Sequence, residues 1–363
     1  MRERFLRKLK IWLIIILVFV LIIGVVVLVK YNKSPQGFLN ELNDLYAQIV
    51  EKSNELYGEK KIEENIELPE KELLTEAQNY YYFQQLSETG KKIYITIEKN
   101  VDKMLDGEEN IPLPEFLNSV AKNEGKDVVS KEFQNAWDAF ITDKSEYFYI
   151  DSSKVCLMTQ ITTKGNSKEY KFSIGKGDNK TYLIDEFSSK QEVEKALKQI
   201  DEVSNQVLKN ADGNNYEKIK YIHDWIIENT EYENKKISNT ANIYGCIVNK
   251  KAICEGYART FKYFMDKLEI PCILVSGEAV DENGKVERHA WNYVYISNNW
   301  YAIDTTWDDP IIIGNGRITD NIKYKYFLKG SSTMLKDHTT SGQVTKDGME
   351  LKYPELPKED LIK

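Results

Sequence analysis

The sequence predicts an α+β fold, in which helices and an antiparallel sheet share one core, preceded by a single N-terminal transmembrane helix. Three observations support this prediction. Residues 11–29 form an unbroken apolar run. The stretch HAWNYVYI at 289–296 alternates as a strand does. Apolar residues recur at three- and four-residue steps after Cys254 and in several upstream segments, which indicates amphipathic helices.

Composition narrows the classes of function. The chain has 363 residues, of which 42% are hydrophobic and 29% charged, so it is long enough to bury a sizeable core. Its formal net charge of −8 offers no electrostatic footprint for nucleic acid. The sequence contains no GxxxxGK[ST] loop, GxGxxG turn, HExxH pair or CxxC pair. Phosphate cradles, dinucleotide sites and structural zinc therefore lack their usual sequence support.

The apolar run is predicted to be a signal anchor. At the helical rise, its nineteen residues just span a hydrocarbon core about 30 Å thick. A secretory signal peptide would have a shorter apolar segment and a small-residue cleavage site. Five cations precede the run, so residues 1–10 are expected to form a cytoplasmic basic tail, and the chain from about residue 31 to lie outside the cytoplasm. These cations are Arg2, Arg4, Arg7, Lys8 and Lys10.

Four segments are expected after the anchor. Residues 30–71 read as an amphipathic helix and a linker, and residues 72–200 as a helical and then strand-rich part, with Gly90 as a stop between two helices and 107–130 as a loop. Residues 201–345 carry the candidate site described below, and residues 346–363 form a C-terminal tail. The strand-rich stretch comprises YFYI, VCLMTQITT, EYKFSI and KTYLI.

His223 lies in a predicted helix over residues 216–229, beside the buried stripe formed by Ile219, Ile222 and Ile226. Two interpretations are open for this residue. It is either a catalytic base or metal ligand, or a histidine that is hydrogen-bonded within the helical core, and the spacing alone favours the second.

Cys254 is predicted to lie in the first turn of a helix. The apolar positions that follow it fall on one helical face, and Pro271 ends the helix. A thiol at a helix N-terminus faces unpaired N–H groups and the positive end of the helix dipole, both of which favour the thiolate. Gly256 permits a close approach of a substrate or of another backbone segment. A cysteine before a helix is nevertheless weak support for catalysis on its own, because a structural thiol fits the same pattern.

His289 and Asp304 are predicted to lie in one β-hairpin formed by HAWNYVYI and WYAIDTTW. A nucleophilic cysteine needs an imidazole to take its proton, and the imidazole needs a carboxylate to fix its tautomer. With a turn at Asn298-Asn299, however, Asp304 lies opposite Tyr293 and His289 lies roughly 13 Å further along. Direct pairing of the two requires a bulge or a turn nearer Ile296-Ser297.

CEGYA, HAWNYV and WYAIDTTWDDP, in this order, resemble the transglutaminase-like superfamily, specifically its bacterial, papain-like members. The resemblance is strong over residues 215–310 and looser upstream and downstream. It implies a papain-like core in which a helix-borne cysteine packs on an antiparallel sheet. The family's nucleophile falls on Cys254, its histidine on His289 and its aspartate on Asp304.

Trp291, Trp300 and Trp307 have two readings. They are either walls of a substrate groove that keep water from an acyl intermediate, or core residues of a small sheet. The other cysteines, Cys156, Cys246 and Cys272, are expected to take no part in catalysis.

The function expected is a membrane-anchored, extracytoplasmic cysteine enzyme that acts on carboxamide or peptide bonds through a thioester intermediate. A cysteine protease or amidase with the same triad is the alternative, and a non-catalytic surface-binding module is a third hypothesis. Protein or peptide substrates are expected, including cell-wall or surface proteins. No cofactor is expected and no metal, because DENG at 281–284 and DDP at 308–310 read as turns rather than as metal ligands.

Overall fold

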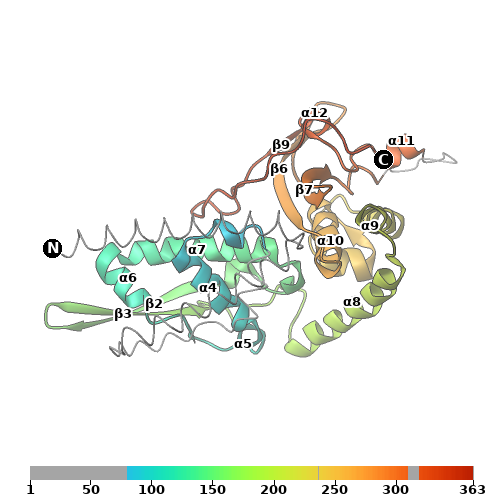
Figure 1. The fold of residues 1–363 in the computed structure, drawn as a ribbon. Coiled ribbons are helices and arrows are strands. Elements are labelled where there is room, and N and C mark those ends of the chain that lie inside the picture. The colour runs from blue at the N-terminus through green and yellow to red at the C-terminus, as the bar shows by residue number, and fades with distance from the viewer. Residues whose placement is uncertain (1–79, 236, 310–318, 363) are drawn as a thin grey trace, which may run out of the picture. The chain divides into compact units, whose positions relative to one another are not determined.

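The computed structural model describes residues 80–235, 237–309 and 319–362 (Figure 1). The predicted anchor at 11–29 and the predicted amphipathic helix after it lie outside these residues. Among the helices of the described part, none has both the length and the apolar content required to cross a membrane. The described residues all belong to one unit, residues 67–363.

The first part of the described chain is helical and carries a small sheet. A short 3-10 turn, η1 (Phe83–Gln85), precedes the helices, which are α4 (Glu88–Lys99), α5 (Val101–Leu105), α6 (Leu117–Glu124) and α7 (Lys126–Asp143). Two further 3-10 turns follow, η2 (Ser145–Tyr147) and η3 (Ser152–Lys154). The antiparallel sheet has the strand order β1-β3-β2, with strands β1 (Ile111–Pro112), β2 (Cys156–Lys164) and β3 (Ser167–Gly175).

Three helices and a π-helical turn form the middle of the chain. They are α8 (Lys190–Asn210), α9 (Asn215–Asn229), η4 (Gly245–Asn249) and α10 (Cys254–Lys267). The start of α9 has a capping box, in which the Asn214 side chain and the Glu217 side chain each accept from the other's backbone N–H. Strands β4 (Glu231–Tyr232) and β5 (Lys251–Ala252) pair in parallel just before α10.

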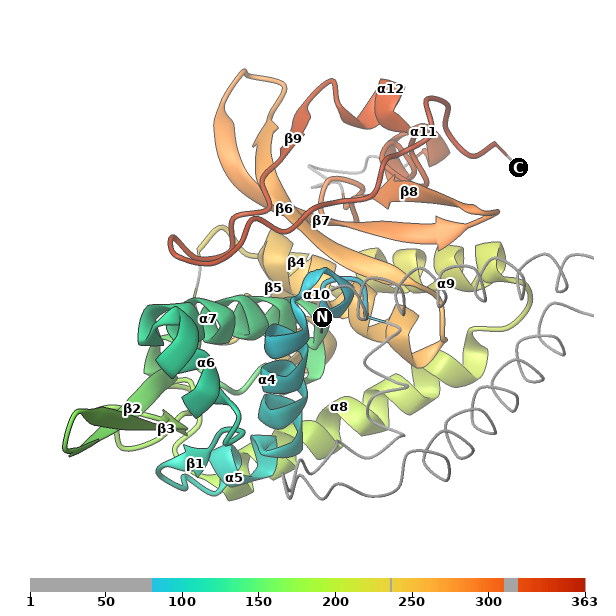
Figure 2. The ribbon, with the colours of Figure 1, turned by 60° about the vertical axis from the view of Figure 1, so that its left-hand side comes forward.

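A four-stranded antiparallel sheet covers α10, and its strand order is β8-β7-β6-β9. Its strands are β6 (Cys272–Val280), β7 (Val286–Ile296), β8 (Asn299–Ile303) and β9 (His338–Thr340). Helix α10 packs against β6 and β7 (Figure 2). The short helices α11 (Asp320–Lys323) and α12 (Ser331–Met334) lie between β8 and β9 in the sequence. Strand β9 thus joins the sheet from more than thirty residues beyond β8.

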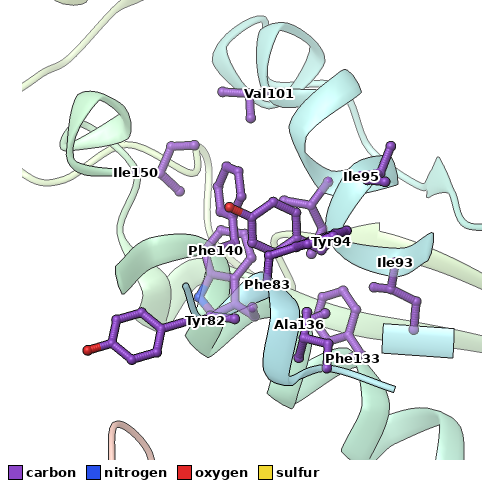
Figure 3. Packing of buried hydrophobic residues seen from close by; sticks show 14 of the residues in the cluster. Tyr82, Phe83, Ile93, Tyr94, Ile95, Val101, Phe133, Ala136, Phe140 and Ile150 are labelled. Carbon is purple, nitrogen blue, oxygen red and sulfur yellow. The ribbon is translucent and has the colours of Figure 1, made fainter. Parts of the chain in front are cut away.

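One apolar core joins the first part of the chain to this sheet. The cluster that contains Tyr82, Phe83, Tyr94 and Phe140 also contains Trp291 of β7 (Figure 3 shows the first four of these). Burial of each such ring stabilises the fold by roughly 1.5–3 kcal/mol. A second cluster packs α8, α9 and α10 against the far ends of β7 and β8.

A buried carboxylate holds the start of the described chain against α7. Asp143, the last residue of α7, accepts hydrogen bonds from the backbone N–H groups of Tyr82 (3.3 Å) and Phe83 (2.9 Å). Burial raises the pKa of Asp143 to about 7, although Lys262 of α10 and the two N–H groups oppose this rise. The Lys262 ammonium group itself lies 2.8 Å from the Asp266 carboxylate, on the same helix.

Outside the candidate site, the structure differs from the sequence-based expectations in three places. Gly90 does not end a helix, because α4 begins at Glu88 and the Ser87 side chain caps it by accepting from the Gly90 N–H. The predicted loop at 107–130 contains all of α6 and the start of α7. YFYI and KTYLI contribute only an isolated bridge between Ile150 and Leu183, whereas VCLMTQITT and EYKFSI form β2 and β3.

Candidate active site

Cys254 is the first residue of α10, as the sequence predicts. Ile253 precedes it in an extended conformation (φ −89°, ψ 177°) and provides no side-chain cap. No N-cap side chain therefore accepts a hydrogen bond from the N–H groups of the first turn. These groups remain suited to stabilise negative charge. Cys254 is partly exposed and packs beside the buried residues Ala258, Leu274 and Ala290.

The loop before the nucleophile is held close to this turn. The Ile253 N–H donates to the Thr240 carbonyl at 2.9 Å. A Cβ atom at Gly256 would collide with the same carbonyl oxygen. Of the two roles considered for this glycine, close approach of another backbone segment is therefore the one that the structure shows.

His289 and Asp304 lie close together. The imidazole Nε2 of His289 is 2.7 Å from Oδ2 of Asp304, and both residues are buried. The hairpin turn lies at Ser297-Asn298, one residue earlier than expected, and both residues have positive φ angles (52° and 63°), as in a type I′ turn. The register used above was therefore wrong.

In the observed register, Asn292 pairs with Ile303, so Asp304 follows the last paired residue of β8 at the level of Trp291. His289 is then two positions further along the same face of β7, which is within reach of the Asp304 side chain. No bulge is needed for the contact.

Asp304 is bonded through both carboxylate oxygens. Oδ1 accepts the backbone N–H groups of Thr306 (2.9 Å) and Trp307 (3.2 Å). Oδ2 faces Nε2 of His289 and also Nε2 of His338, the latter at 3.2 Å. Burial alone would raise the pKa of Asp304, but the charge and hydrogen bonds of His289 and His338 hold this pKa well below its usual range. Asp304 is thus kept as a carboxylate.

His289 also interacts with Cys254. Burial by itself lowers the pKa of His289, but the Asp304 carboxylate, followed by the hydrogen bond and charge of Cys254, raises it to about 10. Since Nε2 is directed at Asp304, Nδ1 is the nitrogen left for the thiol. The arrangement therefore favours an imidazolium ring that is held by the Asp304 carboxylate on one side and faces the Cys254 sulfur on the other.

The three tryptophans are placed differently. Trp291 is 1% exposed, lies in the core and stacks on His289 at a centroid distance of 6.0 Å. Trp307 is partly buried, with its ring 5.3 Å from that of His289. Trp300 contacts Tyr81 and Tyr295 instead, at the turn end of the hairpin. This placement fits core packing for Trp291, and of the three rings only Trp307 is both partly exposed and against His289.

His338 was not singled out by the sequence reasoning. It is the first residue of β9 and 1% exposed. Its Nδ1 atom lies 2.7 Å from Oδ1 of Asp337, so the ring bridges two carboxylates. One nitrogen or oxygen atom from each of His289, Asp304 and His338 lies within 4.8 Å of the others, and the hydrogen bonds to Asp304 account for this closeness.

Tyr232, on β4, is a second residue that was missed. Burial raises its pKa to about 12, with further contributions from Cys254, Glu287 and Asp304. The phenol therefore lies within electrostatic range of the thiol. The sequence around it, NTEYEN, carries no pattern that distinguishes this tyrosine from other tyrosines of the chain.

His223 lies apart from this group, in α9. It is fully buried, with Nδ1 3.0 Å from Oδ1 of Asp224 and Nε2 3.1 Å from Oδ2 of Asp308. Its ring stacks on Tyr324 at 5.5 Å. The interpretation as a hydrogen-bonded core histidine is therefore confirmed. Asp308, in the DDP stretch, also accepts the Tyr326 N–H.

A cavity of about 530 Å³ opens beside the start of α10. Its walls include the aromatic rings of Trp137, Phe140 and Phe148, together with Glu255 and Arg259 of α10. Neither Cys254 nor His289 lines it. The cavity thus adjoins the residue that follows the thiol without enclosing the thiol itself.

Comparison with known proteins identifies the class of this region. Residues 201–305 match the model of the transglutaminase-like superfamily. The chain therefore contains a transglutaminase-like domain over these residues.

Two curated relatives share this region. The Kyphoscoliosis peptidase of Mus musculus is 24% identical over 134 residues, which cover 34% of this chain and 20% of that protein. The Kyphoscoliosis peptidase of Homo sapiens is 24% identical over 154 residues, which cover 38% of this chain and 23% of that protein. The match thus spans about a fifth of each relative.

Solved structures give weaker matches. A crystal structure of a TGase is 19% identical, with a TM-score of 0.29, and the match covers 47% of this chain and 50% of that one. A putative cysteine protease from Cytophaga hutchinsonii is 14% identical, with a TM-score of 0.27, over 44% of this chain and 68% of that one.

Proposed function

We propose that this protein is a cysteine acyl-transfer enzyme in which Cys254, His289 and Asp304 act as nucleophile, base and orienting carboxylate. The observation that supports this most directly is the series of contacts that begins at the first turn of α10. The thiol interacts with His289, and the far nitrogen of His289 lies 2.7 Å from Asp304. A thiol, an imidazole and a carboxylate in this order are the groups required to activate a sulfur nucleophile.

In the first half of the reaction, His289 holds the proton of the Cys254 thiol, and the thiolate sulfur attacks a carboxamide carbon. A carbon–sulfur bond forms, the carbon–nitrogen bond breaks, and the leaving nitrogen takes the proton from His289. Ammonia or an amine departs, and a thioester on Cys254 remains. These steps need no cofactor.

In the second half, an incoming amine or water loses a proton to His289 and attacks the thioester carbon. The carbon–sulfur bond breaks, and the thiolate–imidazolium pair is restored. An amine yields a new amide crosslink, whereas water yields hydrolysis. The backbone N–H of Cys254, at the helix N-terminus, is suited to stabilise the oxyanion in both halves.

A peptidase or amidase is the second candidate, because it shares every step up to the thioester. The names of the two curated relatives, which are called peptidases, favour it. A binding module without catalysis is the third, and the presence of all three triad side chains argues against it.

Incorporation of a labelled amine distinguishes the candidates. The protein is incubated with a glutamine-containing peptide and a fluorescent primary amine, with Cys254→Ala as the control. Amine incorporation by the parent alone identifies a transferase, and release of ammonia or peptide fragments without incorporation identifies a hydrolase. If Cys254 reacts with iodoacetamide near neutral pH no faster than an ordinary thiol, the binding module is favoured and the catalytic proposal fails.

We also propose that residues 11–29 anchor the protein in the cell membrane with the N-terminus in the cytoplasm, so that the substrates are proteins or peptides at the cell surface. The apolar run and its cationic flank support this topology. Protease treatment of intact cells is expected to remove the body of the protein. Full protection in intact cells, with digestion after lysis, would contradict the topology.

A further inference from the structure

Asp304 has two imidazole partners rather than one. Its Oδ2 atom lies 2.7 Å from Nε2 of His289 and 3.2 Å from Nε2 of His338. Its Oδ1 atom is taken by the backbone N–H groups of Thr306 and Trp307. A carboxylate with two acceptor contacts on each oxygen has little freedom to rotate, and His338 supplies the only one of these four contacts that is neither backbone nor part of the proposed triad.

His338 is in turn held from several sides. Nδ1 of its ring faces Oδ1 of Asp337 at 2.7 Å, and Oδ2 of Asp337 accepts the Tyr326 hydroxyl at 2.7 Å. The ring packs against Trp307 at 4.6 Å and Trp291 at 5.0 Å. Its backbone pairs with Ala279 of β6. The position of Nε2 is therefore fixed by the pairing of β9 with β6, by the Asp337 carboxylate and by two indole rings.

We infer that His338 is a positioning residue of the site, whose Nε2 hydrogen bond holds the Asp304 carboxylate against His289. This inference rests on the proposed triad. The His338 ring lies 5.5 Å from the His289 ring, but its hydrogen bond goes to Asp304, so it acts on His289 through that carboxylate. It sets the orientation of the His289 ring, and it shares the negative charge that would otherwise act on His289 alone.

Removal of His338 has two consequences. The Asp304 carboxylate gains freedom to rotate, so the His289 ring is held less well and turnover falls. The carboxylate is also no longer shared, so its charge stabilises the His289 imidazolium more strongly and the pKa of His289 rises. If His338 only filled space, its replacement would leave the pKa of His289 unchanged and would not lower kcat selectively over KM.

The chain has just three histidines, which makes a direct measurement practicable. Ring nitrogen NMR of the labelled protein follows the tautomer and titration of each one. The variants are His338→Leu, which removes the donor, and His338→Gln, whose amide N–H reaches a similar position. His223→Gln is the matched control, because His223 is also fully buried between two aspartates but has no contact with Asp304.

In His338→Leu, we expect kcat to fall by about 10- to 100-fold with little change in KM, since misplacement of a catalytic group by a fraction of an ångström has effects of this size. The His289 titration is expected to move to higher pH. His338→Gln should recover most of the kcat. His223→Gln should lower the melting temperature without moving the His289 titration.

An unchanged kcat and an unchanged His289 titration in folded His338→Leu would overturn the inference. So would one equivalent of bound transition metal in the purified protein that is lost in His338→Gln, since His338 would then be a metal ligand. A different outcome would separate the two proposals. If the His289 titration moves in His338→Leu but neither the parent nor any variant transfers an acyl group, the positioning role of His338 is supported and the proposed function fails.

Discussion

Nε2 of His289 lies 2.7 Å from Oδ2 of Asp304, although the two residues are fifteen positions apart and do not face each other across the β7–β8 ladder. Asp304 bridges the offset because it follows the last paired residue of β8, where the chain leaves the sheet. The backbone N–H groups of the next turn then fix its carboxylate from the other side. The pair thus depends on the end of a strand as well as on the register of the hairpin.

Substitutions in the proposed triad are expected not to be additive. Cys254→Ala should lower turnover by about a millionfold, and His289→Ala in that background should cost almost nothing further, because the two act as one unit. Asp304→Asn should be milder than either, since it disturbs orientation and tautomer only. Single-turnover assays on the parent, Cys254→Ala, His289→Ala, the double variant and Asp304→Asn measure this. Independent, multiplicative losses would show that Cys254 and His289 do not work together.

Alanine replacement of the remaining cysteines should leave turnover within a few-fold of the parent. All four cysteines are free thiols, and Cys246 is buried with its sulfur 3.2 Å from the Thr230 hydroxyl. Cys246→Ala should therefore cost stability, on the order of 1–2 kcal/mol, but not activity. Melting temperatures and kcat are compared for Cys156→Ala, Cys246→Ala and Cys272→Ala. Loss of turnover in a folded Cys246→Ala protein would mean that the nucleophile is misassigned.

Gly256→Ala is expected to destabilise the protein by about 1–3 kcal/mol, because the added methyl group collides with the Thr240 carbonyl and pushes the preceding loop away from α10. Denaturant unfolding measures this loss. Equal stability of parent and Gly256→Ala would show that the loop yields without cost.

Asp143 should make the stability of the protein dependent on pH. Its pKa is raised to about 7 in the folded state by burial, so the stability that it contributes is fully present below its unfolded value, near 4, and is lost as the pH rises through 7. The free energy of unfolding of the parent, relative to Asp143→Asn, should fall by a few kcal/mol between pH 4 and 8.

Thermal or denaturant unfolding of the parent and of Asp143→Asn between pH 4 and 8 tests the sign of this pH dependence. A difference that stays constant with pH would show that Asp143 titrates normally in the fold. Asp138 offers a comparison on the same helix, since Asp138→Asn removes another buried carboxylate that has no contact with Tyr82 or Phe83.

Local patterns predicted the elements of the site well. The helix after Cys254 followed from apolar spacing and from Pro271, and the two strands that bear His289 and Asp304 followed from alternation. The register of the hairpin was not predicted correctly, because more than one turn position was compatible with the sequence. In the structure, the turn residues with positive φ angles are Ser297 and Asn298, one position earlier than expected. An error of one residue in the turn displaced the partner of Asp304 by two positions.

His338 could not be found in the same way. It lies in LKDHTT, where no periodicity or motif marks it, and it reaches Asp304 only because β9 pairs with β6 after a long excursion. Such pairing between distant strands depends on the whole fold and leaves no local signal. The prediction at Gly90 was wrong because a local signal was given too much weight. The glycine was expected to end a helix, but it lies in the first turn of α4, which Ser87 caps.

The apolar core that contains both Tyr82 and Trp291 bears on how the protein can be divided. A fragment cut at residues 201 and 305 would retain Cys254, His289 and Asp304 but would leave one face of β7 bare, without the rings of Tyr82 and Phe83 that cover the same cluster. It would also lack β9, and with it the edge of the sheet beside β6. The autonomous folding unit is accordingly larger than the region of sequence similarity, and the minimal active protein includes chain on both sides of it.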